Sequence, residues 1–199
     1  MFKKLSVDKS YPYILIITGV IGIASSFFLS VDKFKILQNP AYKPSCNLNP
    51  ILACGDVLKT HQGSAFGFPN PFIGLAAFAV FVTIGMGMLA GAKYKKWFHQ
   101  GLQLGTILGL AFISWLFYQS LYKIHALCPW CMAVWAIVII SFWYTLLFNI
   151  DHGFIKLPKN LKAYYPKVRK IHLEIIIIFF LVLTLFILNH FWYYFGKHL

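Results

Sequence analysis

Residues 128–150 have the sequence CPWCMAVWAIVIISFWYTLLFNI, in which two cysteines precede a long apolar run without a charged side chain. A helix of about 20 apolar residues crosses the hydrocarbon core of a bilayer, which is roughly 30 Å thick. Runs of similar character occupy about residues 13–31, 71–91, 101–122, 131–150 and 175–196. The sequence therefore predicts an all-α integral membrane protein with five spans.

The composition of the chain agrees with this fold class. Of its 199 residues, 59% are hydrophobic and only 12% are charged, whereas about 25% of residues are charged in an ordinary soluble domain. We expect a four-helix transmembrane bundle with its core at about residues 10–150, and a fifth, peripheral transmembrane helix at 175–196. No internal repeat or long linker divides the sequence, so residues 1–199 are expected to form a single membrane domain.

The net charge of +13 indicates topology and not nucleic-acid binding, because the basic residues gather in alternate segments between the apolar runs. Twelve cations lie in one set of segments, at Lys3, Lys4, Lys9, Lys93, Lys95, Lys96, Lys156, Lys159, Lys162, Lys167, Arg169 and Lys170. Six lie in the other set, at Lys33, Lys35, Lys43, Lys59, Lys123 and Lys197. The more basic side is expected to be cytoplasmic, with the N-terminus there and the C-terminus outside. All four cysteines then lie on the outer face, where disulfides persist.

The cysteines form two pairs, of which Cys46 and Cys54 lie in the hydrophilic stretch 32–70, and Cys128 and Cys131 begin the fourth span. A four-thiolate zinc site is disfavoured because seven residues separate the first two cysteines. Haem attachment requires a histidine directly after a CxxC motif, but Met132 follows here. Two structural disulfides remain the alternative to a redox function. A CxxC motif within one helical turn is typical of reactive dithiols, which favours redox chemistry.

Local signals make several expectations about these segments. Pro129 fits the first turn of a helix, so Cys128 is expected to cap the fourth span, where the helix dipole favours a thiolate. Stretch 32–70 should be mostly irregular, with a short helix at about 50–60 capped by Asn49. Asn70 is expected to cap the second span. The third span has small residues at four-residue spacing, which predicts a helix-packing face at Gly101, Gly105 and Gly109.

The order of these motifs resembles the vitamin K epoxide reductase family, including its bacterial disulfide-forming members. The matching residues are Cys46-x7-Cys54, then Thr60, then Gly67-Phe68-Pro69-Asn70, and finally Cys128-Pro-Trp-Cys131. The resemblance covers about residues 10–150. Functionally similar oxidases of another family have the CxxC pair first and the separated pair later, so the order of the two pairs is specific.

The resemblance implies an electron relay in which all four cysteines are catalytic. A partner thiol reduces the Cys46–Cys54 disulfide, Cys54 exchanges with Cys128, and a quinone of the ubiquinone or menaquinone (vitamin K) type is held near Cys131. Mobility of stretch 32–70 is expected to bring Cys54 to Cys128. The residues that resemble quinone contacts are Asn70, Trp135, which replaces a tyrosine of many relatives, and Thr60. No metal is expected.

By this resemblance the chain is expected to be a membrane thiol:quinone oxidoreductase of the bacterial inner membrane. It would reoxidise a secreted thioredoxin-like (DsbA-type) thiol protein and so support disulfide bond formation. Some relatives carry that partner as a further domain; this chain ends at Leu199, so a separate partner is expected. Reduction of vitamin K epoxide or quinone as the main activity stays open as an alternative, and so does a non-catalytic membrane scaffold with structural disulfides.

Overall fold

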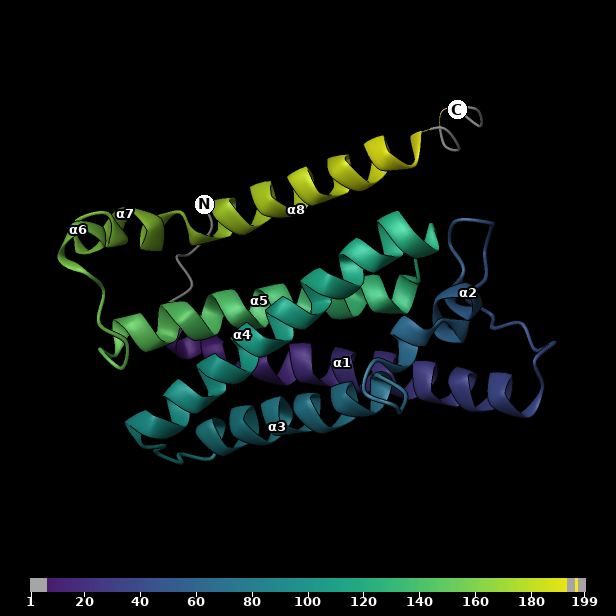
Figure 1. Cartoon of the computed structure of the whole chain (residues 1–199). Coiled ribbons are helices and arrows are strands. Elements are labelled where there is room, and N and C mark those ends of the chain that lie inside the picture. Colours follow the sequence, from purple (N-terminus) through teal and green to yellow (C-terminus); the bar gives the residue numbers. More distant parts are fainter. Residues whose placement is uncertain (1–6, 193–195, 197–199) are drawn as a thin grey trace. The chain divides into compact units, whose positions relative to one another are not determined.

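The computed structural model describes residues 7–192 and residue 196. It contains two compact units, Met1–Phe154 and Ile155–Leu199, and each is described by itself. The helices of the first unit are α1 (Val7–Gln38), α2 (Cys54–Lys59), η1 (His61–Ser64), α3 (Pro71–Leu89), α4 (Lys96–Gln119), η2 (Ser120–Ile124) and α5 (Pro129–Asp151) (Figure 1). Those of the second are α6 (Lys159–Lys162), α7 (Tyr165–Lys170) and α8 (His172–His190).

Five helices are long and apolar enough to cross a membrane, and they lie at Val7–Gln38, Pro71–Leu89, Lys96–Ile124, Pro129–Asp151 and His172–His190. The predicted all-α membrane fold with five spans is therefore confirmed. The last predicted span, 175–196, includes residues 193–195, which lie outside the described residues, as do Lys3, Lys4 and Lys197 of the charge pattern.

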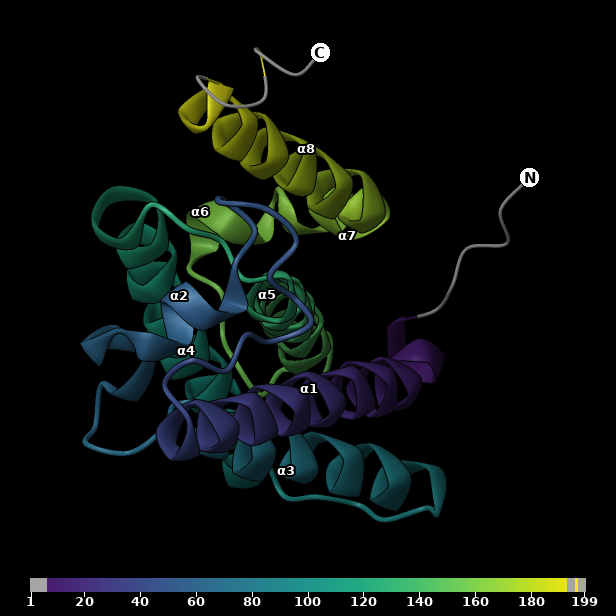
Figure 2. The same ribbon diagram turned by 90° about the vertical axis from the view of Figure 1, so that its right-hand side faces the viewer.

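Helix α1 is the central element of the first unit. It packs along α3 on one side and α5 on the other, and α4 packs against α5 (Figures 1 and 2). Small residues allow the close approach of α1 and α3. A Cβ atom on Gly22 would overlap the ring of Phe78, and one on Gly85 would lie 2.7 Å from the Pro12 carbonyl oxygen. In lipid, where apolar side chains gain nothing by leaving the solvent, such backbone proximity is a main source of helix association.

Polar side chains also connect the long helices inside this unit. Tyr11 on α1 donates a hydrogen bond to Thr145 Oγ1 on α5 at 3.1 Å, and both side chains are buried. One level further along, Ser141 donates to Thr18 Oγ1 at 3.0 Å. Polar residues inside a membrane bundle need such partners, because the surrounding hydrocarbon offers none. These bonds fix α5 against α1 and so set the position of the cysteines at the start of α5.

Large apolar side chains are exposed along the outside of the long helices, as a lipid environment requires. They include Ile17 and Phe27 on α1, Val80 on α3, and Leu104 and Leu108 on α4. A soluble protein with this many exposed apolar side chains would aggregate. The exposed surface therefore supports the membrane assignment independently of helix length.

Helix α1 continues to Gln38, beyond the predicted end at residue 31. The additional turns bring Asp32 and Lys33 onto a helix, and both side chains are buried. Lys33 Nζ donates to the Leu58 carbonyl oxygen at 2.5 Å and thereby holds α2 against the end of α1. A buried ammonium group needs such an acceptor. The Leu58 carbonyl oxygen supplies it, so the charged residues that follow the apolar run can lie on the helix.

The short helix predicted at about 50–60 is confirmed only for its second half. Helix α2 begins at Cys54, and its N-cap is Ala53, which makes no side-chain capping bond. Asn49 Oδ1 instead accepts hydrogen bonds from the backbone N–H groups of Ile51 and Leu52, at 2.9 and 2.7 Å. An asparagine that bonds to the backbone two residues ahead closes a turn, so Asn49 shapes the loop and does not cap a helix.

Candidate functional site

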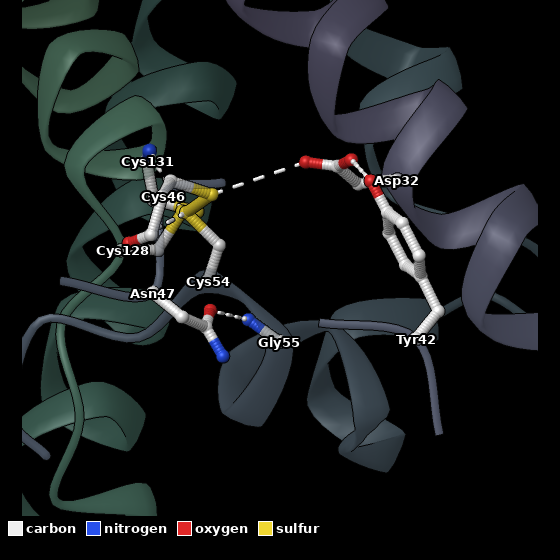
Figure 3. Close-up of a disulfide and its surroundings, with 8 residues drawn as sticks. All are labelled: Asp32, Tyr42, Cys46, Asn47, Cys54, Gly55, Cys128 and Cys131. Atoms are coloured by element: carbon white, nitrogen blue, oxygen red, sulfur yellow. Dashed lines mark hydrogen bonds between the residues drawn. A yellow bond between two sulfur atoms is a disulfide. The ribbon is translucent and has the colours of Figure 1, made fainter. Parts of the chain in front are cut away.

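The four cysteines meet at one end of the first unit, where α1 ends and α5 begins; we call it the cysteine end. Cys46 and Cys54, the loop pair, form a disulfide. Asn47 Oδ1 accepts a hydrogen bond from the Gly55 N–H at 2.8 Å and so ties the chain after Cys46 to the chain after Cys54 (Figure 3). The loop pair is thus held on both sides of its disulfide.

Cys128 and Cys131, the helix pair, are free thiols at the start of α5. Cys128 is the N-cap residue, and its Sγ accepts a hydrogen bond from the Cys131 N–H at 3.4 Å. Pro129 occupies the first turn, where its missing N–H costs no hydrogen bond. The predicted capping by Cys128 is confirmed, and it sets the two sulfur atoms on the first turn of one helix.

The two pairs belong to one apolar cluster. Its buried members are Leu29, Ile36, Cys46, Cys54, Val57, Leu58, Ala126 and Cys128, and Cys131 packs against them. The exposed fraction is 0% for Cys54 and Cys128 but 8% for Cys46. Of the loop pair, therefore, Cys46 is the one that a thiol arriving from water can reach, while Cys54 faces the interior with Cys128.

A backbone bridge joins the segments that precede Cys54 and Cys128. Ala53 N–H donates to the Leu127 carbonyl oxygen at 2.8 Å, and Leu127 N–H donates to the Ile51 carbonyl oxygen at 2.7 Å. The arrangement is a parallel bridge between Leu52 and Leu127. Because Cys128 directly follows Leu127 and Cys54 comes two residues after Leu52, the bridge holds Cys54 beside the start of the helix pair. The expectation that mobility of stretch 32–70 brings Cys54 to Cys128 stays a prediction.

Replacing Ala53 by proline tests this bridge, because proline removes the N–H that bonds to Leu127 and cannot adopt the φ of −140° that Ala53 has in the bridge. We expect thiol–disulfide exchange between the two pairs to slow about tenfold. Without the bridge, Cys54 would be held less well in the position from which it attacks Cys128, which lowers the effective concentration of its thiol there. Timed alkylation and peptide mapping measure this exchange. Reduction of the Cys46–Cys54 disulfide by a small dithiol is the internal control and should change less than about twofold. Unchanged exchange in Ala53→Pro would show that the bridge does not position Cys54.

Asp32 and Tyr42 lie beside the loop pair and were not identified as site residues from the sequence. Asp32 is 8% exposed, and its Oδ2 lies 3.9 Å from Cys46 Sγ. Tyr42 donates a hydrogen bond to Asp32 Oδ1 at 3.0 Å (Figure 3). The available signal was one acid at the polar end of an apolar run. The sequence did not indicate that Asp32 contacts Cys46, because the contact depends on the path of the loop between them.

An apolar cavity of about 490 Å³ opens beside the helix pair, with walls from α1, α3, α4 and α5. Cys131 is the only one of the four cysteines in its lining, and Asn70 and Trp135 line it too. Its other polar residues are Ser26, Gln62, Thr106 and Ser120. A cavity of this size and character suits a lipid-soluble ring compound.

The residues that resemble quinone contacts take different places. Asn70 is the N-cap residue of α3 but makes no side-chain capping bond. Its Nδ2 donates to the Gln62 carbonyl oxygen at 2.7 Å, and its Oδ1 accepts from Ala65 N–H at 2.9 Å. An amide nitrogen has two hydrogens, and the bond to Gln62 uses one of them. Asn70 thus holds the loop before α3 and faces the cavity as well.

Trp135 and Thr60 differ in their relation to the cavity. Trp135 is 4% exposed, and its ring meets Phe117 edge-on at 5.3 Å between ring centroids. Thr60 does not line the cavity. Its hydroxyl donates to the Val57 carbonyl oxygen at 2.7 Å and accepts from Gly63 N–H at 3.2 Å, which caps η1. The structure brings Asn70 and Trp135 to the cavity, and Thr60 to the loop above it.

The prediction that the glycines of α4 form a helix-packing face is wrong. Gly101, Gly105 and Gly109 line the cavity. A Cβ atom on Gly101 or Gly105 would meet nothing within 4 Å, and one on Gly109 would meet only Val138 at 3.5 Å. Close packing of glycines occurs between α1 and α3 instead. On α4, the absence of side chains widens the cavity.

The sequence as a whole was compared with protein families. The model of the vitamin K epoxide reductase family matches residues 13–146, which is more than half of the chain. The chain belongs to the vitamin K epoxide reductase family. The matched region includes both cysteine pairs, Asn70 and Trp135. No curated protein matches the sequence.

Membership of the vitamin K epoxide reductase family makes the chain a membrane oxidoreductase of the thiol/quinone type. The geometry of the cysteine end suits this class. The disulfide and the helix pair share one apolar cluster, and Cys131 of the helix pair also lines the apolar cavity. Such an arrangement can pass electrons between an aqueous thiol and a lipid-soluble acceptor.

Proposed function

We propose that this protein is a thiol:quinone oxidoreductase that takes electrons from a secreted thioredoxin-like protein and passes them to a membrane quinone, thereby supporting disulfide bond formation. The observation that carries the proposal is the position of Cys131. It packs against the cluster that contains the other three cysteines and also forms part of the cavity wall. One sulfur atom therefore belongs to both the thiol relay and the lipid-facing site.

The first step takes place at the loop pair. A partner thiolate attacks Cys46 Sγ, because Cys54 is fully buried. The Cys46–Cys54 bond breaks, a mixed disulfide forms between the partner and Cys46, and Cys54 leaves as a thiolate. A second partner thiol then attacks the mixed disulfide and releases Cys46. The partner leaves oxidised, and the loop pair is a dithiol.

The second step passes the electrons from the loop pair to the helix pair. Cys54, held by the backbone bridge, attacks Cys128 of a Cys128–Cys131 disulfide, and Cys131 leaves as a thiolate. Cys46 then attacks Cys54 in the Cys54–Cys128 mixed disulfide. The products are a Cys46–Cys54 disulfide and a reduced helix pair. The structure has this pairing, with the loop pair oxidised and the helix pair reduced.

The third step takes place at the cavity, whose residues fit a quinone. The walls are almost wholly apolar, with Cys131 at one position and the Asn70 amide at another. When bound, a quinone accepts two electrons and two protons from a dithiol. Cys131 would face its ring, Asn70 would donate a hydrogen bond to it, and Trp135 would form part of its binding surface. The apolar walls exclude water, which limits side reactions of the thiolate.

The proposed orientation places the cysteine end on the outer face of a bacterial inner membrane. The support is the distribution of positive charge, since cytoplasmic loops carry an excess of lysine and arginine. Among the described residues, the connection between α3 and α4 contains Lys93 and Lys95, and the segment Ile155–Lys170 is strongly basic. The N-terminus would be cytoplasmic and the C-terminus outside.

The family name supports a second candidate, in which reduction of vitamin K epoxide or quinone is the main activity. The two candidates use the same thiols and differ in the acceptor. Purified protein should be given a reduced thioredoxin-like thiol and, in parallel, ubiquinone, menaquinone or vitamin K epoxide. We expect quinone reduction at a rate of about 1–10³ per second, with slower turnover of the epoxide. Faster turnover of the epoxide would favour the second candidate.

A third result of the same assay would contradict both enzymatic candidates. If the cysteines cycle between thiol and disulfide but neither acceptor is reduced, the protein is a scaffold with structural disulfides. Boiled protein and buffer with the same thiol are the controls, because quinones react slowly with free thiols.

A further inference from the structure

The Asp32 carboxylate lies where it could accept a hydrogen bond from Cys46 once the Cys46–Cys54 disulfide is reduced. Its Oδ2 lies 3.9 Å from Cys46 Sγ, within reach of a hydrogen bond to sulfur. In the Cys46–Cys54 disulfide, however, Cys46 Sγ has no hydrogen to donate. The contact becomes a hydrogen bond only when Cys46 is a thiol. The pair is thus arranged for a reduced form of the loop pair.

The carboxylate is fixed by its surroundings. Tyr42 donates to Asp32 Oδ1 at 3.0 Å, which leaves Oδ2 directed at Cys46 (Figure 3). Lys33 Nζ donates to the Leu58 carbonyl oxygen, and Lys35 Nζ lies 5.3 Å from the centroid of the Tyr42 ring. Lys59 on α2 donates to the Pro40 carbonyl oxygen. Each of these cations therefore contacts a group other than Asp32 Oδ2. The thiols of the same cluster are Cys54, Cys128 and Cys131, and the adjoining segments also contain Lys43, Asp56, His61, Lys123 and His125.

We propose that Asp32 is the general base for Cys46 when Cys46 resolves the internal mixed disulfide; the proposal rests on the relay order proposed above. In that step the Cys46 S–H bond breaks and its proton passes to Asp32 Oδ2. The Cys46–Cys54 bond forms, the Cys54–Cys128 bond breaks, and Cys128 leaves as a thiolate. Two electrons thereby move from the loop pair to the helix pair, and no further reactant is needed.

The burial of the site explains why a base is needed. The two sulfur atoms that Cys46 acts on, those of Cys54 and Cys128, are fully buried, and Asp32 Oδ2 at 3.9 Å from Cys46 Sγ is a fixed acceptor for the proton. The thiolate is the reacting form in disulfide exchange. Asp32 is a catalytic residue in this proposal because it touches the reacting sulfur. Tyr42 is a positioning residue because it acts through Asp32.

The pH dependence of the resolving step tests the proposal and does not require the quinone. Protein with all four cysteines oxidised receives one equivalent of a small dithiol, and samples are alkylated at intervals between pH 6 and 9. Peptide mapping then gives the decay of the Cys54–Cys128 mixed disulfide. The thiolate fraction of an unassisted thiol falls tenfold for each pH unit below about pH 8.5. With a carboxylate base, we expect the wild-type rate to vary less than about threefold between pH 6 and 8.

Asp32→Asn removes the base but keeps an oxygen for the Tyr42 hydroxyl. We expect its resolving rate to fall about 100-fold from pH 8 to pH 6 and to approach the wild-type rate at pH 9, where the thiol ionises without help. The matched control is Asp56→Asn, since Asp56 is an exposed acid on α2; it should behave as wild type. A merely structural role for Asp32 would lower the rate equally at every pH.

Three outcomes separate this proposal from the proposed function. A wild-type rate that falls tenfold per pH unit overturns the role of Asp32, even if Asp32→Asn does not fold. A pH profile of Asp32→Asn equal to that of wild type overturns it as well. Failure of wild type to reduce quinone, together with the expected profiles, would overturn the proposed acceptor but leave Asp32 as the base for Cys46.

Discussion

Replacing Cys131 by alanine is expected to abolish quinone reduction, whichever thiol supplies the electrons. Cys131 is the only cysteine that lines the cavity, and without it the helix pair cannot form a disulfide. The expected loss is at least about 10⁴-fold, comparable to removal of a catalytic nucleophile. Quinone absorbance during steady-state turnover measures it. The Cys46–Cys54 disulfide should still form, because it joins two other cysteines and the Asn47–Gly55 hydrogen bond beside it does not use Cys131.

Cys46→Ala provides the contrast that gives the order of the relay. We expect it to abolish turnover driven by a thioredoxin-like protein, because Cys46 is the member of the loop pair that is reachable from water. A small membrane-permeant dithiol can reduce the helix pair directly, so turnover with that donor should persist. Equal losses with both donors in Cys46→Ala, or residual protein-driven turnover in Cys131→Ala, would contradict the order proposed here.

Filling the cavity from α4 is expected to weaken quinone binding without disturbing the thiols. In Gly105→Phe, the new side chain would enter the cavity, since a Cβ atom there meets nothing within 4 Å. We expect the KM for quinone to rise at least about tenfold, as the ring and part of the cavity compete for one space. Steady-state kinetics with a saturating dithiol measure the KM, and timed alkylation should show exchange between the two pairs unchanged within about twofold.

Leu104→Phe is the matched control for this variant. Leu104 is the neighbour of Gly105 on the same helix, and its side chain is 57% exposed. It adds a ring to the lipid-facing side and should leave the KM unchanged. Gly105→Phe should also unfold no more readily than wild type, because a glycine within a helix destabilises it by about 0.5–1 kcal/mol. An unchanged KM in Gly105→Phe would show that quinone binds elsewhere.

The five membrane spans, the start of α5 and the family were predictable, because they depend on composition and on local sequence motifs. The bilayer fixes the length of an apolar helix, so the sequence alone indicated five spans. The Cys128-Pro129 pair indicated a helix start, since a proline fits where no N–H is needed. The order of the two cysteine pairs indicated the family, because the motifs and their spacing are specific.

The misjudged features depend on what occupies the space around a residue. Glycines at four-residue spacing have the same pattern whether a neighbouring helix or a cavity lies against them. At Gly22 the space contains Phe78, and at Gly105 it is open. The contact between Asp32 and Cys46 was unpredictable for a similar reason, because it depends on the additional turns of α1 and on the path of the loop. Neither the open space beside Gly105 nor the contact between Asp32 and Cys46 can be read from the local sequence.

The bridge between Leu52 and Leu127 has a consequence for how this sequence can vary. Its two hydrogen bonds use only main-chain atoms of Ile51, Ala53 and Leu127, so they do not depend on the identity of these buried apolar side chains. Chain length is constrained much more strongly. Inserting one residue between Ala53 and Cys54, or between Leu127 and Cys128, would keep the bridge but turn the sulfur away from its partner. Apolar substitutions of similar size at these buried positions, proline excepted, should therefore be tolerated, whereas single-residue insertions or deletions should separate the two halves of the relay.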